Sequence, residues 1–248
     1  MELLKVTDLH TSFFTPAGEV KAVNGISFSL EKGKVLGIVG ESGSGKSVTA
    51  YSILQILANP GKIVSGSVKL NGEELVGASK EVMNSVRGNK ISIIFQDPMT
   101  SLNPVFTVGN QLVEAIMLHT DRNKEEALER AIEMLSLVGV NEPEKRVKQY
   151  PHEFSGGMRQ RVMIAMALAC EPDILIADEV LSVGDYAFQE KCEKRMAQLL
   201  ANGTTVIFVS HSTEQVKRLC NKATWLEHGK IIMTGDAETV CDAYSKKY

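Results

Sequence analysis

A glycine-rich octapeptide near the start of the chain reads Gly40-Glu41-Ser42-Gly43-Ser44-Gly45-Lys46-Ser47. It fits the pattern G-x-x-x-x-G-K-[ST] and stands between an apolar run, Val35–Val39, and a segment of helical character, Lys46–Leu57. In that setting the glycines let backbone N–H groups face bound phosphates, and the helix N-terminus adds partial positive charge. Lys46 would reach the terminal phosphates, and the Ser47 hydroxyl would ligate Mg²⁺. The octapeptide therefore predicts a nucleotide site, whereas the alternative is a glycine-rich turn that binds nothing.

Two adjacent carboxylates follow a second apolar run. Ile174–Ala177 is typical of a strand buried on both faces, and Asp178 and Glu179 come directly after it. Acids in this position suit a phosphate site, because one can bind magnesium while the other polarises the attacking water. We expect Asp178 to serve the metal and Glu179 to act as the general base. The alternative is a helix cap or a solvated strand edge.

The flanking segments alternate between strand and helix patterns. Strand patterns cover Leu3–Phe14 and Val20–Leu30 as an antiparallel hairpin, and then Gly66–Leu70, Ile91–Phe95, Thr204–Val209, Ala223–Glu227 and Lys230–Thr234. Helical patterns cover Thr107–Val138, a segment from Ser155 to about Cys170, and a short stretch at the end of the chain. We expect the helical stretch from Thr107 to be an insertion on an α/β body.

Composition excludes several classes of protein. The 248 residues are 44% hydrophobic and 23% charged, which is typical of a folded globular protein rather than a disordered or coiled-coil one. The formal net charge of -3 argues against a nucleic-acid partner. The four cysteines form no C-x-x-C pair, so neither a zinc site nor a disulfide framework is expected. The start of the chain has no signal-peptide pattern and no segment has the roughly 18 apolar residues of a membrane span, so we expect a cytoplasmic protein.

A third motif, Phe154-Ser155-Gly156-Gly157-Met158-Arg159-Gln160-Arg161, opens a helix with a serine and two glycines. It offers a second helix N-terminus that can face phosphate, although Ser155 is also an ordinary N-cap residue. Together with the octapeptide and the Asp-Glu strand, in this order, it makes the chain resemble nucleotide-binding subunits of ABC transporters. The resemblance implies that two subunits, identical or different, pair head to tail, with the Ser-Gly-Gly helix of one covering ATP held by the other.

The resemblance extends over the whole chain and assigns roles residue by residue. It implies that ATP is contacted by Gly40, Ser42, Gly43, Ser44, Gly45, Lys46, Ser47, Val48 and Phe13, and across the dimer by Ser155, Gly156, Gly157 and Asp185. It implies Mg²⁺ binding by Ser47, Gln96 and Asp178, and hydrolysis assisted by Glu179, Gln96 and His211. A strand-end histidine such as His211 also has a purely structural alternative. The adenine contact falls on Phe13 or its neighbour Phe14, and the alternative is an ordinary core residue of the hairpin.

The resemblance implies an α/β fold of the P-loop NTPase kind, with a mixed central sheet, an N-terminal antiparallel β subdomain and an inserted helical subdomain. Residues 1–248 would form one nucleotide-binding domain, with residues 1–96 and 155–248 as its core and residues 97–154 as the helical subdomain. Its partners would be a second ATPase subunit and integral membrane permease subunits, with no nucleic acid. The chain would lie peripherally on the inner face of the cell membrane.

The resemblance divides near the Asp-Glu pair. Residues 1–179 are similar to ATPases of dipeptide, oligopeptide and nickel importers, with the mark Phe95-Gln96-Asp97-Pro98-Met99-Thr100-Ser101-Leu102-Asn103-Pro104. Residues 180–248 instead resemble polysaccharide or teichoic-acid exporter ATPases, and Val180-Leu181-Ser182-Val183-Gly184-Asp185 replaces the importer pattern. We hypothesise an engineered or recombined chimera joined near Asp178 to Val180. Its expected function is transport-coupled ATP hydrolysis in a peptide importer, with an exporter as the alternative.

Three further alternatives remain. An ATPase of DNA repair or chromosome architecture would carry long coiled coils between Lys46 and Ser155, where the sequence shows no sustained heptads. A P-loop kinase would have no use for the Ser-Gly-Gly helix. A nucleotide-binding module without turnover would keep every motif, and only an assay separates it from an ATPase.

Overall fold

The computed structural model describes residues 1–96, 101–180 and 203–247 of the chain. It forms two compact units, Met1–Asn84 with Leu200–Tyr248, and Ser85–Leu199. Helix α2 (Lys80–Val86) contains the boundary between them. The predicted Asp185 lies outside the described residues.

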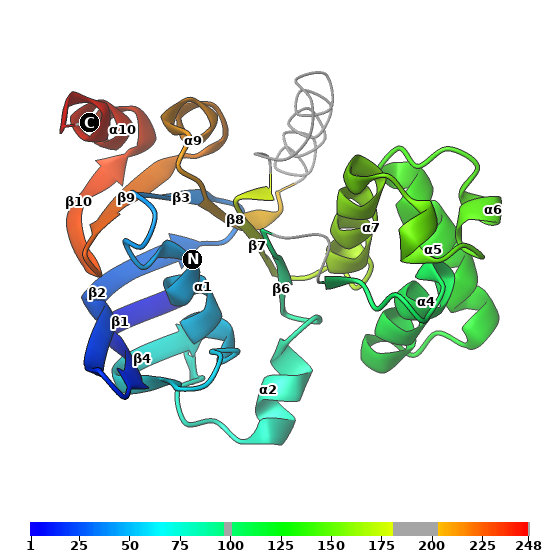
Figure 1. Cartoon of the computed structure of the whole chain (residues 1–248), viewed down its shortest axis with the longest axis horizontal. Helices are drawn as coiled ribbons and strands as arrows, with labels where there is room; N and C mark the ends of the chain where they lie inside the picture. The colour runs from blue at the N-terminus through cyan, green and yellow to red at the C-terminus, as the bar shows by residue number, and fades with distance from the viewer. Residues whose placement is uncertain (97–100, 181–202, 248) are drawn as a thin grey trace. The chain divides into compact units, whose positions relative to one another are not determined.

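The first unit contains an antiparallel sheet in the order β2-β1-β4-β5, visible in blue and cyan in Figure 1. Strands β1 and β2 form the predicted hairpin, with Phe13 opposite Val20 near the turn. Leu4, Ile26 and other alternating apolar residues are buried, which gives this sheet one core-facing surface. The bounds are β1 Glu2–Thr15, β2 Gly18–Glu31, β4 Gly61–Leu70 and β5 Glu73–Glu74.

The same unit contains the strands β10, β9, β3 and β8 side by side in that order. Strands β9, β3 and β8 are parallel, and β10 is antiparallel to β9, so the sheet is mixed as predicted. Every residue of β3 and β8 is buried, as their almost wholly apolar sequences predict. The bounds are β3 Val35–Val39, β8 Thr205–Val209, β9 Lys222–Glu227, β10 Lys230–Asp236, α1 Lys46–Leu54, α9 Thr213–Leu219 and α10 Ala237–Lys247.

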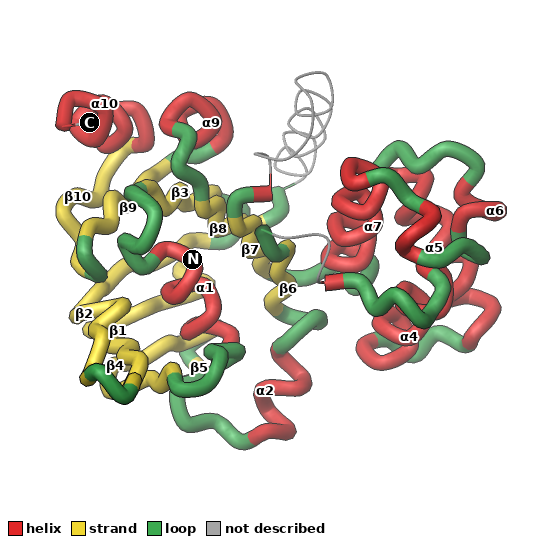
Figure 2. The backbone as a smooth tube through the Cα atoms, viewed as in Figure 1, coloured by secondary structure: helices red, strands yellow, loops and turns green. Residues whose placement is uncertain are grey.

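The second unit combines two parallel strands with a group of helices, drawn in yellow and red in Figure 2. Helix α5 packs against α4 and α7, and α7 also contacts β6. The helices meet through buried apolar residues such as Leu112, Ala131 and Val162. The bounds are β6 Ile91–Ile94, β7 Ile174–Asp178, α4 Val108–His119, α5 Lys124–Leu137, α6 Pro143–Arg146, η1 Pro151–Glu153 and α7 Gly156–Leu168.

Local signals explain where the helices begin and end. The helical stretch predicted from Thr107 is two helices, because Asn123 starts a new one: its Oδ1 accepts hydrogen bonds from the backbone N–H groups of Glu125 and Glu126, both at 3.0 Å. Helix α1 ends at Leu54, earlier than predicted, because Gln55 has a left-handed backbone with φ of 51°. Among the described residues, no helix has the length and apolar character needed to cross a membrane.

Candidate nucleotide site

The glycine-rich loop connects β3 to α1 in a conformation that depends on its glycines. Gly43 and Gly45 have φ values of 78° and 100°, in the left-handed region that side chains disfavour. A Cβ atom at Gly45 would lie 2.3 Å from the carbonyl oxygen of Ala22, closer than real contacts allow. The loop therefore turns tightly against the neighbouring hairpin, and the predicted strand, loop and helix are all present.

The side chain of Lys46 lies inside the curl of this loop. Its Nζ donates hydrogen bonds to the carbonyl oxygens of Gly40 and Glu41, each at 2.7 Å. Lys46 is only 5% exposed, so its positive charge is largely shielded from water. Negative charge stabilises a buried ammonium group, so the position of Lys46 suits a bound anion such as phosphate.

The start of α1 adds two further features that favour an anion. Its N-cap is Gly45, which has no side chain to accept hydrogen bonds from the first N–H groups of the helix. Ser44 is 5% exposed, and its buried hydroxyl has no hydrogen-bond partner within the described part of the chain. Together with Lys46, these donors fit a chain of phosphate groups bound at a helix N-terminus.

The parallel strands of the first unit bring His211 to the same edge as the loop. Ile38 of β3 is opposite Val209 of β8, and Gly40 and His211 each follow two residues later. The backbone N–H of Ser210 also donates to the carbonyl of Ile38 at 3.2 Å. The carboxyl edge of a parallel sheet is where α/β proteins bind ligands.

The second unit brings Gln96 and Glu179 together by the same principle. Ile94 of β6 is opposite Ala177 of β7, and Gln96 and Glu179 each follow two residues later. Gln96 Nε2 donates a hydrogen bond to Glu179 Oε2 at 2.7 Å. Asp178, the residue before Glu179, is the last residue of β7 and is fully buried. Hydroxyl, amide and carboxylate oxygens of the kind found on Ser47, Gln96 and Asp178 are ligands that Mg²⁺ accepts.

The backbone at Glu179 is unusual for a residue with a side chain. Its φ of 50° lies in the left-handed region. Such a conformation costs of the order of 1–3 kcal/mol and persists where surrounding contacts impose it, commonly at functional sites. The carboxylate of Glu179 is paired with Gln96, whereas the residues from 181 onward, which the alternative of a helix cap concerns, lie outside the described part of the chain.

The Ser-Gly-Gly segment opens α7 and leaves its N-terminus accessible. Ser155 is the N-cap, and its Oγ accepts a hydrogen bond from the N–H of Met158 at 3.4 Å. Ser155 and Gly156 are exposed, and a Cβ atom added at Gly156 would meet no described atom within 4 Å. Buried Phe154 fixes the start of the helix, because its carbonyl accepts from Arg159 Nε at 3.0 Å.

The aromatic residues predicted for the adenine base differ in exposure. Phe13 is half-buried and its ring lies over the backbone of Gly61, where a Cβ atom would be 2.7 Å from Phe13 Cε1. Phe14 is 48% exposed. Val48, in the first turn of α1, is half-buried.

The predicted site residues thus fall into two groups. The first unit holds the loop, Phe13 and His211, and the second unit holds Gln96, Ser155–Gly157, Asp178 and Glu179. Within each unit, residues distant in sequence meet at strand ends. Among the described residues, no group of three or more His, Cys, Asp or Glu side chains is arranged to hold a metal by itself.

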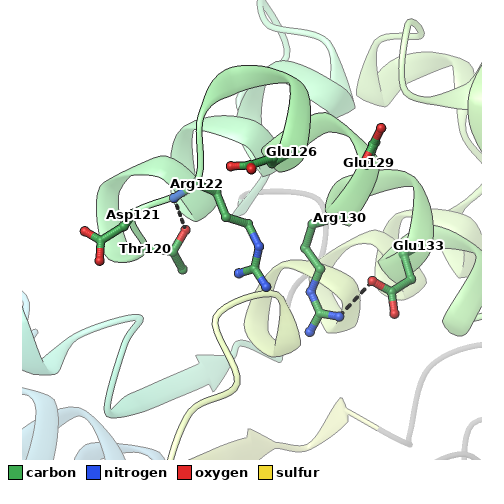
Figure 3. Close-up of a pocket in the computed structure, with 7 residues that line it drawn as sticks. All are labelled: Thr120, Asp121, Arg122, Glu126, Glu129, Arg130 and Glu133. Carbon is green, nitrogen blue, oxygen red and sulfur yellow. Dashed lines mark hydrogen bonds and ion pairs between the residues drawn. The ribbon is translucent and has the colours of Figure 1, made fainter.

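An open hollow of about 760 Å³ lies elsewhere, on the helical part of the second unit (Figure 3). Its lining residues are Thr120, Asp121, Arg122, Glu126, Glu129, Arg130 and Glu133. Arg130 already pairs with Glu133 at 2.9 Å and with Glu171 at 2.7 Å. The lining carries four acids against two arginines, so it does not suit the strongly negative phosphates of a nucleotide.

Three supporting hydrogen bonds were not predicted from the sequence. The N–H of Gly229, in the turn between β9 and β10, donates to the Ser44 carbonyl at 3.0 Å, and the Gly229 carbonyl accepts from Asn24 at 2.8 Å. The turn itself was predicted from His228-Gly229, but its contact with the loop depends on the packing of distant segments. Gln160, within the Ser-Gly-Gly motif, donates to the carbonyl of Val180, directly after Glu179.

Comparison with known proteins agrees with the motifs and the fold. A family model described as ABC transporter matches residues 23–182. The oligopeptide transport ATP-binding protein OppD of Escherichia coli K12 is 47% identical over 239 residues, which cover 96% of this chain and 71% of OppD. The dipeptide transport ATP-binding protein DppD of Bacillus subtilis is 44% identical over 241 residues, covering 96% and 72% of the two chains.

A solved structure confirms the predicted fold class. The dimeric post-hydrolysis state of the ATP-binding cassette MJ0796, bound to ADP and Pi, superposes with a TM-score of 0.85 at 24% identity and covers 95% of this chain and 99% of that one. The family match covers well over half of the chain, and its relatives match almost all of it. The chain therefore belongs to the ABC transporter family, as one of its ATP-binding, ATP-hydrolysing domains.

Proposed function

We propose that this chain is the ATPase subunit of a peptide importer. The observation that carries this proposal is the 47% identity to OppD over 96% of the chain, together with similar identity to DppD. Both relatives are named for peptide transport. The charged helical hollow and the formal net charge of -3 give no support to a nucleic-acid partner.

The loop of the first unit would bind the phosphates of ATP. Backbone N–H groups of residues 40–47 and the Ser44 hydroxyl donate to phosphate oxygens, and Lys46 exchanges its carbonyl contacts for the terminal phosphates. Ser47, Gln96 and Asp178 would hold Mg²⁺, which neutralises negative charge on the phosphate oxygens when bound. Phe13 would stack on the adenine base.

Glu179 would then act as general base in hydrolysis. Its carboxylate accepts the proton of the attacking water, and the hydrogen bond from Gln96 at 2.7 Å orients it for that task. His211, at the carboxyl edge shared with the loop, would contact the γ-phosphate. In-line attack needs little more than this positioning and charge stabilisation.

Turnover would take place between two subunits arranged head to tail. The exposed N-terminus of α7, with Ser155, Gly156 and Gly157, would face the ATP of the partner subunit, and Asp185 would contact the same ATP across the dimer. The ATP-binding cassette MJ0796, which shares the fold, is described as dimeric.

The chain would work from the inner face of the cell membrane through permease subunits. We propose residues 1–96 and 155–248 as the nucleotide-binding core and residues 97–154 as the helical subdomain that contacts the permease. Hydrolysis would reopen the dimer and pass this motion to the membrane helices through that subdomain.

Phosphate release by the unaltered chain and by Glu179→Gln tests the catalytic proposal. We expect the variant to lose turnover but to keep its affinity for ATP, because the amide retains the shape of the side chain and cannot accept a proton. Equal phosphate release by the two proteins would contradict the role of Glu179. Phosphorylation of a small molecule in place of release would indicate a kinase.

A second candidate partner is an exporter permease. The observation that favours it is the segment Val180-Leu181-Ser182-Val183-Gly184-Asp185, which resembles exporter ATPases and motivates the hypothesis of a chimera. Co-purification with ATP against the permease subunits of a peptide importer and of a polysaccharide exporter separates the two. Capture by the importer pair alone supports the main proposal, whereas capture by the exporter pair alone assigns partner choice to residues 180–248.

A further inference from the structure

The amide side chain of Gln160 is buried in the second unit. Gln160 lies in α7, between one and two turns after the N-cap Ser155, and is 2% exposed. Its Nε2 donates a hydrogen bond to the carbonyl oxygen of Val180. Helix α7 is thereby joined to the backbone that leaves the end of β7.

The carbonyl that Gln160 holds belongs to the residue after Glu179. Glu179 has a left-handed backbone, and its carboxylate accepts a hydrogen bond from Gln96 at 2.7 Å. This acid is therefore held from two directions: Gln96 contacts its side chain, and Gln160 holds the carbonyl of the residue that follows it. An uncommon backbone conformation persists where contacts of this kind impose it.

The amide oxygen of Gln160 indicates that folding stability alone does not explain why a glutamine occupies this position. Its Oε1 is buried and has no hydrogen-bond partner among the residues that the structure describes. An unsatisfied buried acceptor destabilises the folded state, and the neighbours of Gln160 in α7 include the apolar, buried Val162 and Met163. An apolar side chain would suit the core here, whereas only a donor can hold the Val180 carbonyl.

We propose that Gln160 is a positioning residue for ATP hydrolysis. It holds the carbonyl of Val180, and so the backbone of the residue directly after Glu179, in a position that keeps the Glu179 carboxylate directed at the attacking water. Because the same helix begins at the exposed Ser155, Gln160 also links that N-terminus to the general base. This inference rests on the proposed role of Glu179 and adds the residue that keeps it in place.

Two substitutions separate positioning from packing. Gln160→Leu keeps a similar volume and removes the donor, and Gln160→Glu keeps the shape and replaces the donor with an acceptor when ionised. We expect each to lower kcat about 10- to 100-fold at neutral pH, with KM for ATP within about twofold of the unaltered chain. Met163→Leu, at another buried position of α7, is the matched control and should leave kcat unchanged.

The pH profile of Gln160→Glu provides a readout that a packing role would not move. Burial raises the pKa of a carboxyl group, and the protonated form can donate to the Val180 carbonyl. The kcat of this variant, relative to the unaltered chain, should therefore recover as pH falls from about 8.5 to about 6, whereas that of Gln160→Leu should not. Urea unfolding at each pH establishes that both variants are folded where kcat is measured.

The outcomes separate this inference from the function on which it rests. If Glu179→Gln abolishes turnover while both Gln160 variants retain full kcat, the positioning role is wrong and the general base stands. Parallel losses of kcat and of folding stability in both Gln160 variants, with no recovery of Gln160→Glu at low pH, also overturn it. Absence of turnover by the unaltered chain overturns both proposals.

Discussion

Gly45 shows how one backbone position supports the phosphate loop. Gly43 and Gly45 both have left-handed φ values, but only at Gly45 would a Cβ atom approach another backbone atom, the Ala22 oxygen at 2.3 Å. Gly43→Ala should therefore cost about 1–2 kcal/mol of unfolding free energy from its backbone conformation alone. Gly45→Ala should cost more, because the hairpin must also move. Urea unfolding of the two variants measures the difference, and equal losses would contradict the tight contact.

Lys46 should matter far more for ATP binding than for folding. Lys46→Met keeps the length and apolar stem of the side chain and removes the buried charge that faces the loop. Hydrogen bonds to charged groups contribute about 1.5–3 kcal/mol, so ATP affinity should fall roughly 10- to 150-fold. Titration calorimetry measures this change. An unchanged dissociation constant would mean that Lys46 only braces the Gly40 and Glu41 carbonyls.

At the scale of an element, Asn123 determines that the helical region contains two helices. It forms a capping box with Glu126, whose carboxylate accepts from the Asn123 N–H at 2.9 Å. Asn123→Ala should lower the free energy of unfolding by about 1 kcal/mol, because the first N–H groups of α5 lose their acceptor. Lys124→Ala, at an exposed neighbour outside the box, is the control. Similar urea midpoints for the two variants would contradict the role of the cap.

His119, the last residue of α4, gives the second unit a dependence on pH. Its imidazole packs against Gly88, where a Cβ atom would lie 2.7 Å from Nε2, and burial lowers the pKa of His119 below its usual value of 6.5. The unfolded chain therefore binds a proton more readily, so this contribution to stability is present above pH 6.5 and is lost as pH falls toward the folded-state pKa. His119→Asn should lose less stability than the unaltered chain between neutral and mildly acidic pH. Thermal unfolding of both proteins across that pH range measures the two losses of stability. Equal losses in the variant and in the unaltered chain would contradict the role of His119.

The elements that sequence patterns predict best are those with a single dominant signal. The apolar runs Val35–Val39 and Ile174–Ala177 predict buried strands, and both strands are observed. Short α9 was not predicted, although Ser212 caps it by accepting from the N–H of Gln215 at 3.4 Å. Its apolar residues are too few for a clear period, and its position is set by packing against β3 and α10.

For the candidate site, residue types are predictable and contacts are not. Spacing and flanking runs identify the loop, Asp178 and Glu179. The hydrogen bond from Gln96 to Glu179 depends on β6 and β7 being parallel neighbours in one register, which a sequence separation of 83 positions does not reveal. The hydrogen bond from Gln160 to the Val180 carbonyl depends in the same way on how α7 packs against β6 in its unit.

At the scale of the whole molecule, the chain distributes its proposed chemistry over two compact units. The unit with the loop supplies phosphate-binding groups, and the unit with α7 supplies the general base and an exposed helix N-terminus. A Cβ atom added at Gly156 would meet no described atom within 4 Å, so the N-terminus of α7 is open. Such a helix N-terminus can bind phosphate from another molecule. In the proposed head-to-tail pairing, the start of α7 of a second chain would complete each nucleotide site.

A substitution at Gly156 tests that assembly without disturbing the fold. Gly156 is exposed, and a side chain there meets no described atom within 4 Å; an acid in the first turn of a helix also stabilises it by about 0.3–1 kcal/mol. Gly156→Asp should therefore fold as well as the unaltered chain and bind ATP with the same affinity, while its carboxylate repels the phosphates of ATP held by a second chain. In the Glu179→Gln background, which keeps ATP bound, light scattering should detect an ATP-dependent dimer that Gly156→Asp abolishes. A dimer that persists in the double variant would mean that the start of α7 does not face the nucleotide of a partner subunit.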